Sequence, residues 1–318
     1  MKLKNYGLII EQPRVSDYIV GAGSAVKAQD ILNVTGDWEP KIPEGEYQNG
    51  VYFDTMGCVT FSALNILEML FKAKFGIEIN FSDRFTAKMS GTTLKGNSFS
   101  NVAESIRKDG LLLEDRWDYP RTQRTPVFVR DEYYETIPNV LIEEAKKFLN
   151  DYEIQYEWVP ATKEKLREML QYAPLQVQVV AWYDKNKDGV YEKPAGVDFN
   201  HGTVLIEYPE NGKPKIFDSY SPFVKELEDG YDFGTYALKY QINKKDSMQA
   251  FLDLFKKKND TKLVRNQATG EWAWFYNNSL RIPKTVDRKV EALANYLIKK
   301  EGANISQEDW SKLPQVEL

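Results

Sequence analysis

Apolar residues cover most of the surface of one predicted helix, which spans residues 58–75. A helix that is apolar on nearly every side is typical of a protein core, because no polar face is left for solvent. Cys58 falls in the first turn of this helix. The apolar positions are Val59, Phe61, Ala63, Leu64, Ile66, Leu67, Leu70 and Phe71.

Further along the chain the periodicity changes from helical to alternating. Helical spacing predicts helices over 99–109, 139–150 and 162–172, the last preceded by a Thr-x-x-Lys start. Alternation then predicts strands over 153–159, 175–183, 202–208, 213–218 and 235–242, with Asn-Gly-Lys at 211–213 as a hairpin turn. A helical half followed by a β-rich half predicts an α+β fold.

The pattern divides the chain into three parts. Residues 1–45 are irregular and form an N-terminal arm, and 46–245 carry the elements above. Residues 246–318 form a C-terminal α/β appendage, with a helix at 246–257, a hairpin over 263–276 and a charged helix at 285–300. For the arm, a segment draped over the body is favoured over an inhibitory propeptide, because nothing in it predicts long charged helices.

Composition narrows the classes of function. The chain has 318 residues and 42% hydrophobic content, enough to bury a full core. Its 42 basic and 47 acidic residues are interspersed, so no basic stripe predicts a nucleic-acid partner. A single cysteine and a single histidine exclude an internal disulfide and a Cys/His metal cluster. Without a signal peptide or a membrane-length apolar run, we expect a cytoplasmic protein that contacts no membrane and needs no cofactor.

Three residues carry candidate chemistry. Cys58 follows a glycine at a helix start, and a helix N-terminus and a nearby imidazolium both favour the reactive thiolate. His201 follows Cys58 by 143 residues, inside the interval of about 130–150 typical of papain-type enzymes. Antiparallel pairing of 202–208 with 213–218 is expected to bring His201 beside Asp218, which would hold the imidazole tautomer. The alternatives are a buried structural cysteine and a structural histidine.

Several segments together resemble the papain-like cysteine peptidases. Cys-Val-Thr-Phe-Ser-Ala at 58–63 is similar to the family's Cys-Trp-Ala-Phe-Ser-Ala helix start, with Val59 in place of tryptophan. K-G-N-S-F-S-N-V-A-E-S-I-R-K-D-G-L-L-L-E-D-R-W-D-Y-P is similar to its glycine loop, helix and Tyr-Pro ending. I-F-D-S-Y-S resembles Asn-Ser-Trp-Gly, with Asp218 at the asparagine and Tyr220 where tryptophan shields the histidine. The resemblance covers roughly residues 45–245.

The resemblance implies a papain-like two-lobe fold and a Cys58, His201 and Asp218 triad that hydrolyses peptide bonds of a peptide or protein substrate. It also implies that Gly96 and Asn97 lie beside bound substrate. The family's oxyanion glutamine stands six residues before the cysteine, where this chain has Tyr52. Gln48 is the candidate replacement, with Asn49 or the backbone alone as alternatives.

Two other functions stay open. In the first alternative, the fold is a structural or interaction component of a virion or larger assembly. Its partners would then bind through the arm or the appendage. A cell-wall peptide amidase or transpeptidase would use the same triad. An open cleft with the Cys58 sulfur close to His201 favours an enzyme, whereas a cleft filled by the arm favours a scaffold or a zymogen.

Two local patterns have competing interpretations. Asp184, Asn186 and Asp188 match the first half of a calcium loop, but position twelve is Ala195, so an exposed hairpin turn is favoured over a calcium site. The aromatic residues at 272–276 are interpreted as one face of a small β-core, with a carbohydrate or partner platform as the alternative.

Overall fold

The computed structural model describes the chain in segments. These are residues 4–21, 30–49, 53–117, 133–184, 187–245, and the C-terminal strand segments 262–266, 272–276, 279–282, 305–308 and 315–317. The chain divides into two compact units, Met1–Lys245 and Asp246–Leu318, and each is described by itself.

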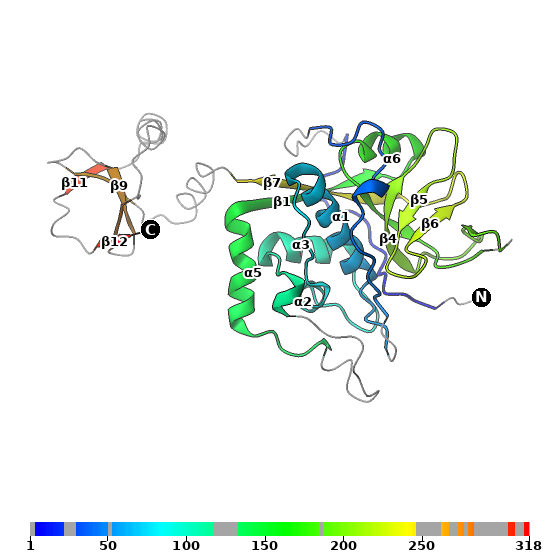
Figure 1. Cartoon of the computed structure of the whole chain (residues 1–318), viewed down its shortest axis with the longest axis horizontal. Coiled ribbons are helices and arrows are strands. Elements are labelled where there is room, and N and C mark those ends of the chain that lie inside the picture. Colours follow the sequence, from blue (N-terminus) through cyan, green and yellow to red (C-terminus); the bar gives the residue numbers. More distant parts are fainter. Residues whose placement is uncertain are drawn as a thin grey trace. The chain divides into compact units, whose positions relative to one another are not determined.

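The first unit has the expected α+β organisation, with helices α1, α2, α3 and α5 grouped beside a sheet (Figure 1). The helices are α1 (Cys58–Phe75), α2 (Asp83–Met89), α3 (Phe99–Asp109), α5 (Asn139–Asp151) and α6 (Lys163–Leu170), with short 3-10 turns at Glu39–Lys41 and Glu114–Arg116. The strands are β1 (Tyr152–Pro160), β2 (Leu175–Val179), β3 (Val190–Tyr191), β4 (His201–Glu207), β5 (Lys215–Phe217), β6 (Val224–Leu227) and β7 (Tyr236–Lys244).

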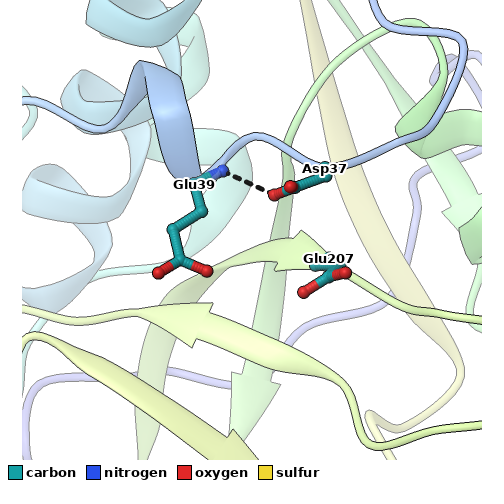
Figure 2. Close-up of side chains that lie close together, drawn as sticks. All are labelled: Asp37, Glu39 and Glu207. Carbon is teal, nitrogen blue, oxygen red and sulfur yellow. Dashed lines mark hydrogen bonds between the residues drawn. The ribbon is translucent and has the colours of Figure 1, made fainter.

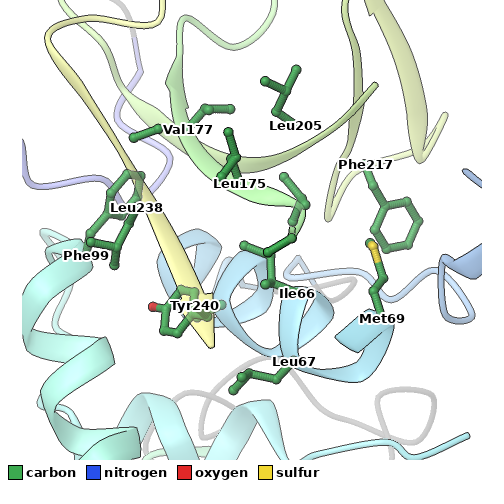
Figure 3. Close-up of a cluster of buried hydrophobic side chains, with 14 of the residues drawn as sticks. Ile66, Leu67, Met69, Phe99, Leu175, Val177, Leu205, Phe217, Leu238 and Tyr240 are labelled. Atoms are coloured by element: carbon green, nitrogen blue, oxygen red, sulfur yellow. The ribbon is translucent and has the colours of Figure 1, made fainter. Parts of the chain in front are cut away.

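The central helix α1 is buried as predicted. Its residues from Cys58 through Phe71 are all buried, and the helix ends at Gly76 in the left-handed conformation that favours glycine. Figure 3 shows Ile66 and Met69 facing side chains of the sheet, among them Leu175 and Phe217. This contact between helix and sheet forms the main core and fixes where the first residue of α1 lies.

The seven strands run in the order β1-β7-β2-β4-β5-β6-β3. All neighbours are antiparallel except β3 and β6, which pair in parallel. The predicted hairpin is confirmed, because β4 and β5 pair antiparallel with Val204 opposite Phe217. The start of β4 and the end of β5 therefore lie at the same end of the hairpin, which is the arrangement expected for His201 and Asp218.

The elements differ from the sequence prediction at several places, and the short strands β3 and β6 were not predicted. The strand expected over 175–183 ends at Val179, because side chains bind the next backbone N–H groups: Val180 donates to Tyr231 Oη and Ala181 donates to Asn200 Oδ1. Helix α2 was not predicted, since it has only seven residues; Ser82 caps it by accepting the N–H of Phe85.

The second unit contains a five-stranded sheet in the order β11-β8-β9-β10-β12. The predicted hairpin is confirmed as β8 paired antiparallel with β9. The predicted helices at 246–257 and 285–300 lie outside the described residues, as do the side chains of the aromatic cluster. The strands are β8 (Lys262–Asn266), β9 (Trp272–Tyr276), β10 (Ser279–Ile282), β11 (Ile305–Glu308) and β12 (Gln315–Glu317).

Within the described residues, no helix has the length and apolar character needed to cross a membrane.

Candidate active site

Cys58 is the first residue of α1, where the backbone N–H groups of the first turn point out of the helix. Gly57 precedes the helix without a side-chain cap, so no side chain competes for that end. The thiol Sγ accepts a hydrogen bond from the N–H of Gly202 at 3.4 Å. This contact places the sulfur beside the start of β4, next in sequence to His201.

His201 and Asp218 form a buried pair across the β4–β5 hairpin. Nε2 of His201 donates to Oδ1 of Asp218 at 2.6 Å, and both side chains are fully shielded from solvent. The second ring nitrogen, Nδ1, has no hydrogen-bond partner among the described residues. The acid therefore fixes one nitrogen of the ring and leaves the other for the thiol.

The charge state of His201 follows from its neighbours. Burial lowers the pKa of His201, but the Asp218 carboxylate, its hydrogen bond and the Cys58 thiol together raise that pKa to about 10. Burial raises the pKa of Asp218, yet His201 and Lys225 outweigh burial and lower it below its ordinary value. Near neutral pH the pair is thus an imidazolium and a carboxylate.

Gln48 is buried near this pair, and hydrogen bonds to both its amide oxygen and its amide nitrogen fix its orientation. Oε1 accepts the hydroxyl of Ser219 at 2.8 Å, so Nε2 is the end that faces away from Ser219. Nε2 donates to Asp54 Oδ1 and to the carbonyl oxygen of Tyr6, both at 2.9 Å. Asn49 instead forms an isolated backbone bridge with Asp54, and Tyr52 lies outside the described residues.

The N-terminal arm runs across the site. The Tyr6 N–H donates to the carbonyl of Asn200 at 3.0 Å, and the Tyr6 ring lies edge-on to His201 with ring centroids 5.8 Å apart. Gly7 adopts φ +112°, and a Cβ there would meet the Met56 carbonyl oxygen at 2.3 Å. The arm backbone therefore packs directly against the residues before Cys58, which is itself fully buried.

Gly96 and Asn97 also contact the arm. Asn97 donates its N–H to Gly7 O and accepts the N–H of Ile9 at its carbonyl, each at 2.9 Å. A Cβ on Gly96 would lie 1.8 Å from Gly7 O, so glycine is required for this approach. The backbone groups expected to bind an extended peptide are thus bound here to an extended segment of the chain itself.

Aromatic rings enclose His201. Tyr220, at the position expected to shield it, has its ring centroid 5.5 Å from the imidazole. Trp182 lies at the same centroid distance, 5.5 Å, nearly perpendicular to the ring. Such rings keep water away from the His201–Asp218 hydrogen bond and so strengthen it.

A group of carboxylates lies apart from these residues. Oxygen atoms of Asp37, Glu39 and Glu207 are within 4.8 Å of one another (Figure 2). The ammonium group of Lys215 binds Glu39 at 2.8 Å and Glu207 at 2.9 Å. A lysine therefore already supplies the positive charge that a metal ion would bring.

The segment with the alternative interpretation as a calcium loop is described only in part, because Asn186 lies outside the described residues. Asp184 accepts the N–H of Gly189 at 3.0 Å and Asp188 accepts the N–H of Val190 at 3.0 Å. These bonds are those of an exposed turn.

No protein-family model and no curated protein sequence matches this chain. The fold is similar to several solved cysteine proteases. The bromelain protease of Ananas comosus is 18% identical over 64% of this chain and 97% of its own, with a TM-score of 0.48. A ragweed pollen cysteine protease in its proform is 17% identical over 65% and 64% of the two chains, also at 0.48. A cysteine protease of Carica candamarcensis is 15% identical over 64% and 96%, at 0.47.

Sequence reasoning missed several residues of this site, among them Tyr6 of the arm. Trp182 directly follows β2, Asn200 directly precedes His201, and Lys225 lies on β6 with its ammonium group on Asp218. Only Lys225 could have been suspected from the sequence, and only weakly. In a strand, alternation puts Lys225 on the same face as Leu227, and the structure shows that both are buried.

Proposed function

We propose that this protein is a cysteine-type amide hydrolase that cleaves peptide bonds. The observation that carries the proposal is the hydrogen bond from Gly202 to the Cys58 sulfur, because it sets the sole thiol beside the His201–Asp218 pair. A thiol at a helix start, an imidazole and an orienting acid are the parts that nucleophilic acyl transfer needs.

The chemistry follows from the geometry. The Cys58 thiolate attacks the carbonyl carbon of the scissile amide, a C–S bond forms, and the carbonyl electron pair moves to oxygen. The imidazolium of His201 then donates its Nδ1 proton to the leaving nitrogen, the C–N bond breaks, and a thioester remains. Water attacks the thioester while His201 accepts its proton, and the carboxylic acid product leaves as the thiolate is restored. Asp218 keeps Nε2 protonated throughout.

Gln48 is the proposed donor to the negative oxygen that forms in this reaction. Its Nε2 already donates to a peptide carbonyl, that of Tyr6, next to His201. Its amide is held by Ser219 and Asp54, so it needs no rearrangement when charge develops. This arrangement supports Gln48 in the role of the oxyanion glutamine, for which the sequence has Tyr52 at the usual spacing.

The proposed activity is latent in the described structure. Cys58 and His201 are both fully buried, and the arm occupies the backbone groups of Asn97 and Asn200 that an extended substrate would need. Substrate access therefore requires that residues 4–11 leave the site.

The test is cleavage of a peptide library by the full chain and by a Gly7→Ala variant whose arm is loosened, each beside its Cys58→Ser counterpart. Amide cleavage that depends on Cys58 supports the proposal. The absence of cleavage in the Gly7→Ala protein, although a thiol probe labels Cys58 in it, contradicts the proposal. Product analysis on muropeptide pools in the same series distinguishes cell-wall peptide cleavage or transpeptidation from general proteolysis.

A second candidate function is a papain-like fold used as a structural or interaction component. The observation that favours it is the same covered site, since a scaffold has no use for an exposed thiol. It predicts that Cys58→Ser leaves the protein's role and its partners unchanged, whereas a hydrolase loses its activity.

A further inference from the structure

Lys225 is a buried lysine whose three N–H donors all find acceptors. It lies on β6, and its side chain is 1% exposed. The ammonium group donates to Asp218 Oδ2 at 2.7 Å and to the backbone carbonyl oxygens of Tyr220 and Pro222. An ammonium has three donors and no acceptor, so this group is fully satisfied in one orientation.

The turn between β5 and β6 determines this contact. The strands pair with Phe217 opposite Val224, and the Asp218 N–H donates to Phe223 O at 2.7 Å. The two carboxylate oxygens of Asp218 consequently face different partners: Oδ1 accepts from His201 and from the Ser219 N–H, and Oδ2 accepts from Lys225.

The charges of the site balance only when Lys225 is counted. Cys58 and His201 together are neutral, either as thiol and imidazole or as thiolate and imidazolium. Asp218 adds one negative charge in a fully buried place, and an unpaired buried charge is strongly unfavourable. Lys225 supplies the compensating positive charge. The Trp182 ring contacts both cations, with its centroid 4.8 Å from the ammonium and 5.5 Å from the imidazole.

We propose that Lys225 is a positioning residue of the hydrolytic site, which fixes Asp218 by Oδ2 and weakens the hold of that carboxylate on the imidazolium proton. A bare buried carboxylate would bind the imidazolium so strongly that His201 would transfer its proton poorly. With Lys225 on the second oxygen, Asp218 orients the ring while the proton stays transferable. This role deepens the proposed function and rests on it.

Several charged or titratable groups face His201 from the surrounding elements. They are Cys58 at the start of α1, Tyr6 of the arm, and Asp218, Tyr220 and Lys225 of the β5–β6 region. Behind Tyr220 lies Asp54, which accepts its hydroxyl. Among these groups, substitution of Lys225 removes the positive charge paired with Asp218 and leaves the carboxylate in place.

His201 is the sole histidine, so one imidazole signal in an NMR titration reports the site directly. The titration uses the full chain with Cys58→Ala, which removes the coupled thiol, with and without Lys225→Met. The expected result is a rise of the His201 pKa by about one unit, because removal of a nearby positive charge stabilises the imidazolium. The matched control is Lys239→Met, since Lys239 is also a buried strand lysine and binds Glu157 at 2.5 Å; it is expected to leave the His201 pKa unchanged.

An unchanged His201 pKa in Lys225→Met overturns the proposal, and so does a fall toward the ordinary value of about 6.5, which marks a loosened site. Lys225→Gln is the second variant: it keeps an N–H donor without the charge, and the same rise is expected. If neither variant folds, the proposal is tested on the wild-type protein through the charge state of Lys225. An ammonium NMR signal from Lys225 that persists above neutral pH supports the proposal, and a neutral amine overturns it.

These measurements need no turnover, so they fail independently of the proposed function. A raised His201 pKa together with absent peptide cleavage leaves the Lys225 pairing intact and rejects the hydrolase. Cleavage whose alkaline pH limit does not move in Lys225→Met keeps the hydrolase and rejects this role of Lys225.

Discussion

The carbonyl oxygen of Tyr6 accepts a hydrogen bond from Nε2 of Gln48 at 2.9 Å. A peptide carbonyl of the chain's own arm thus lies at the amide that we propose to bind the developing oxyanion, with the Tyr6 ring against His201. The arm holds the site through backbone contacts of the type a substrate would make. Release of the arm and reactivity of the thiol are therefore expected to be coupled.

Gly7→Ala is expected to release the arm. The new Cβ would meet the Met56 carbonyl oxygen at 2.3 Å, at a φ of +112° that disfavours L side chains. Backbone strain of roughly 1–3 kcal/mol in the docked arm should raise the open population by about 5- to 150-fold. Iodoacetamide labelling of Cys58 should accelerate by the same factor. The matched control is Gly21→Ala, where φ is also positive at +85° but no atom lies within 4 Å; equal acceleration in both variants would show that the arm does not shield Cys58.

Gln48→Ala is expected to lower the rate of peptide hydrolysis by about 100- to 1000-fold, which is typical for loss of one oxyanion donor. Alkylation of Cys58 develops no oxyanion, so its rate in the Gly7→Ala background should change little. Both rates are measured on the same protein preparation. A parallel fall of hydrolysis and alkylation would mean that Gln48 supports the structure of the site rather than the transition state.

Asp218→Asn is expected to destabilise the protein through Lys225. Breaking a buried ion pair from one side typically costs about 3–5 kcal/mol, because the remaining charge has no partner. The double variant with Lys225→Met removes both charges and should recover much of that loss in denaturant unfolding. Strictly additive losses from the two substitutions would contradict the pairing.

The stability of the protein should fall as the pH rises from about 6.5 to about 10. The pKa of His201 is raised to about 10 in the folded state, so the folded chain retains a proton that the unfolded chain has released. This stabilisation is complete below about pH 6.5 and is lost as the pH passes about 10. The difference in unfolding free energy between wild type and His201→Gln should shrink across this window, by at most about 1.4 kcal/mol per pH unit. A constant difference would refute the raised pKa.

The long elements could be predicted from the sequence because several signals agree at each of them. Helix α1 is apolar over most of its surface and lies between Gly57 and Gly76, and α3 ends at Gly110, so both were predicted with the bounds that the structure shows. The β4–β5 hairpin has an Asn-Gly turn and alternation on each side. These local signals sufficed to bring His201 and Asp218 together.

What could not be predicted depends on tertiary contacts without a local signature. Strand β6 reads as Val-Lys-Glu-Leu, and a lysine in a short strand is ordinarily exposed, so neither the strand nor the burial of Lys225 was expected. Many contacts of the arm are backbone hydrogen bonds, which any residue can make. Side chains add to them, since Glu11 and Arg14 both bind Ser100. Gly7 and Gly96 are required because only glycine permits their close approach, but that requirement is visible only once the segments meet.

The most direct test of the central claim compares the alkylation rate of Cys58 at pH 6 in Gly7→Ala and in Gly7→Ala/His201→Ala. An ordinary thiol with a pKa of about 8.5 is less than about 1% ionised at that pH, whereas a thiol paired with an imidazolium stays reactive. The His201→Ala substitution should slow alkylation about tenfold or more. Equal rates in the two proteins would contradict the claim that Cys58 and His201 form a nucleophile and its base.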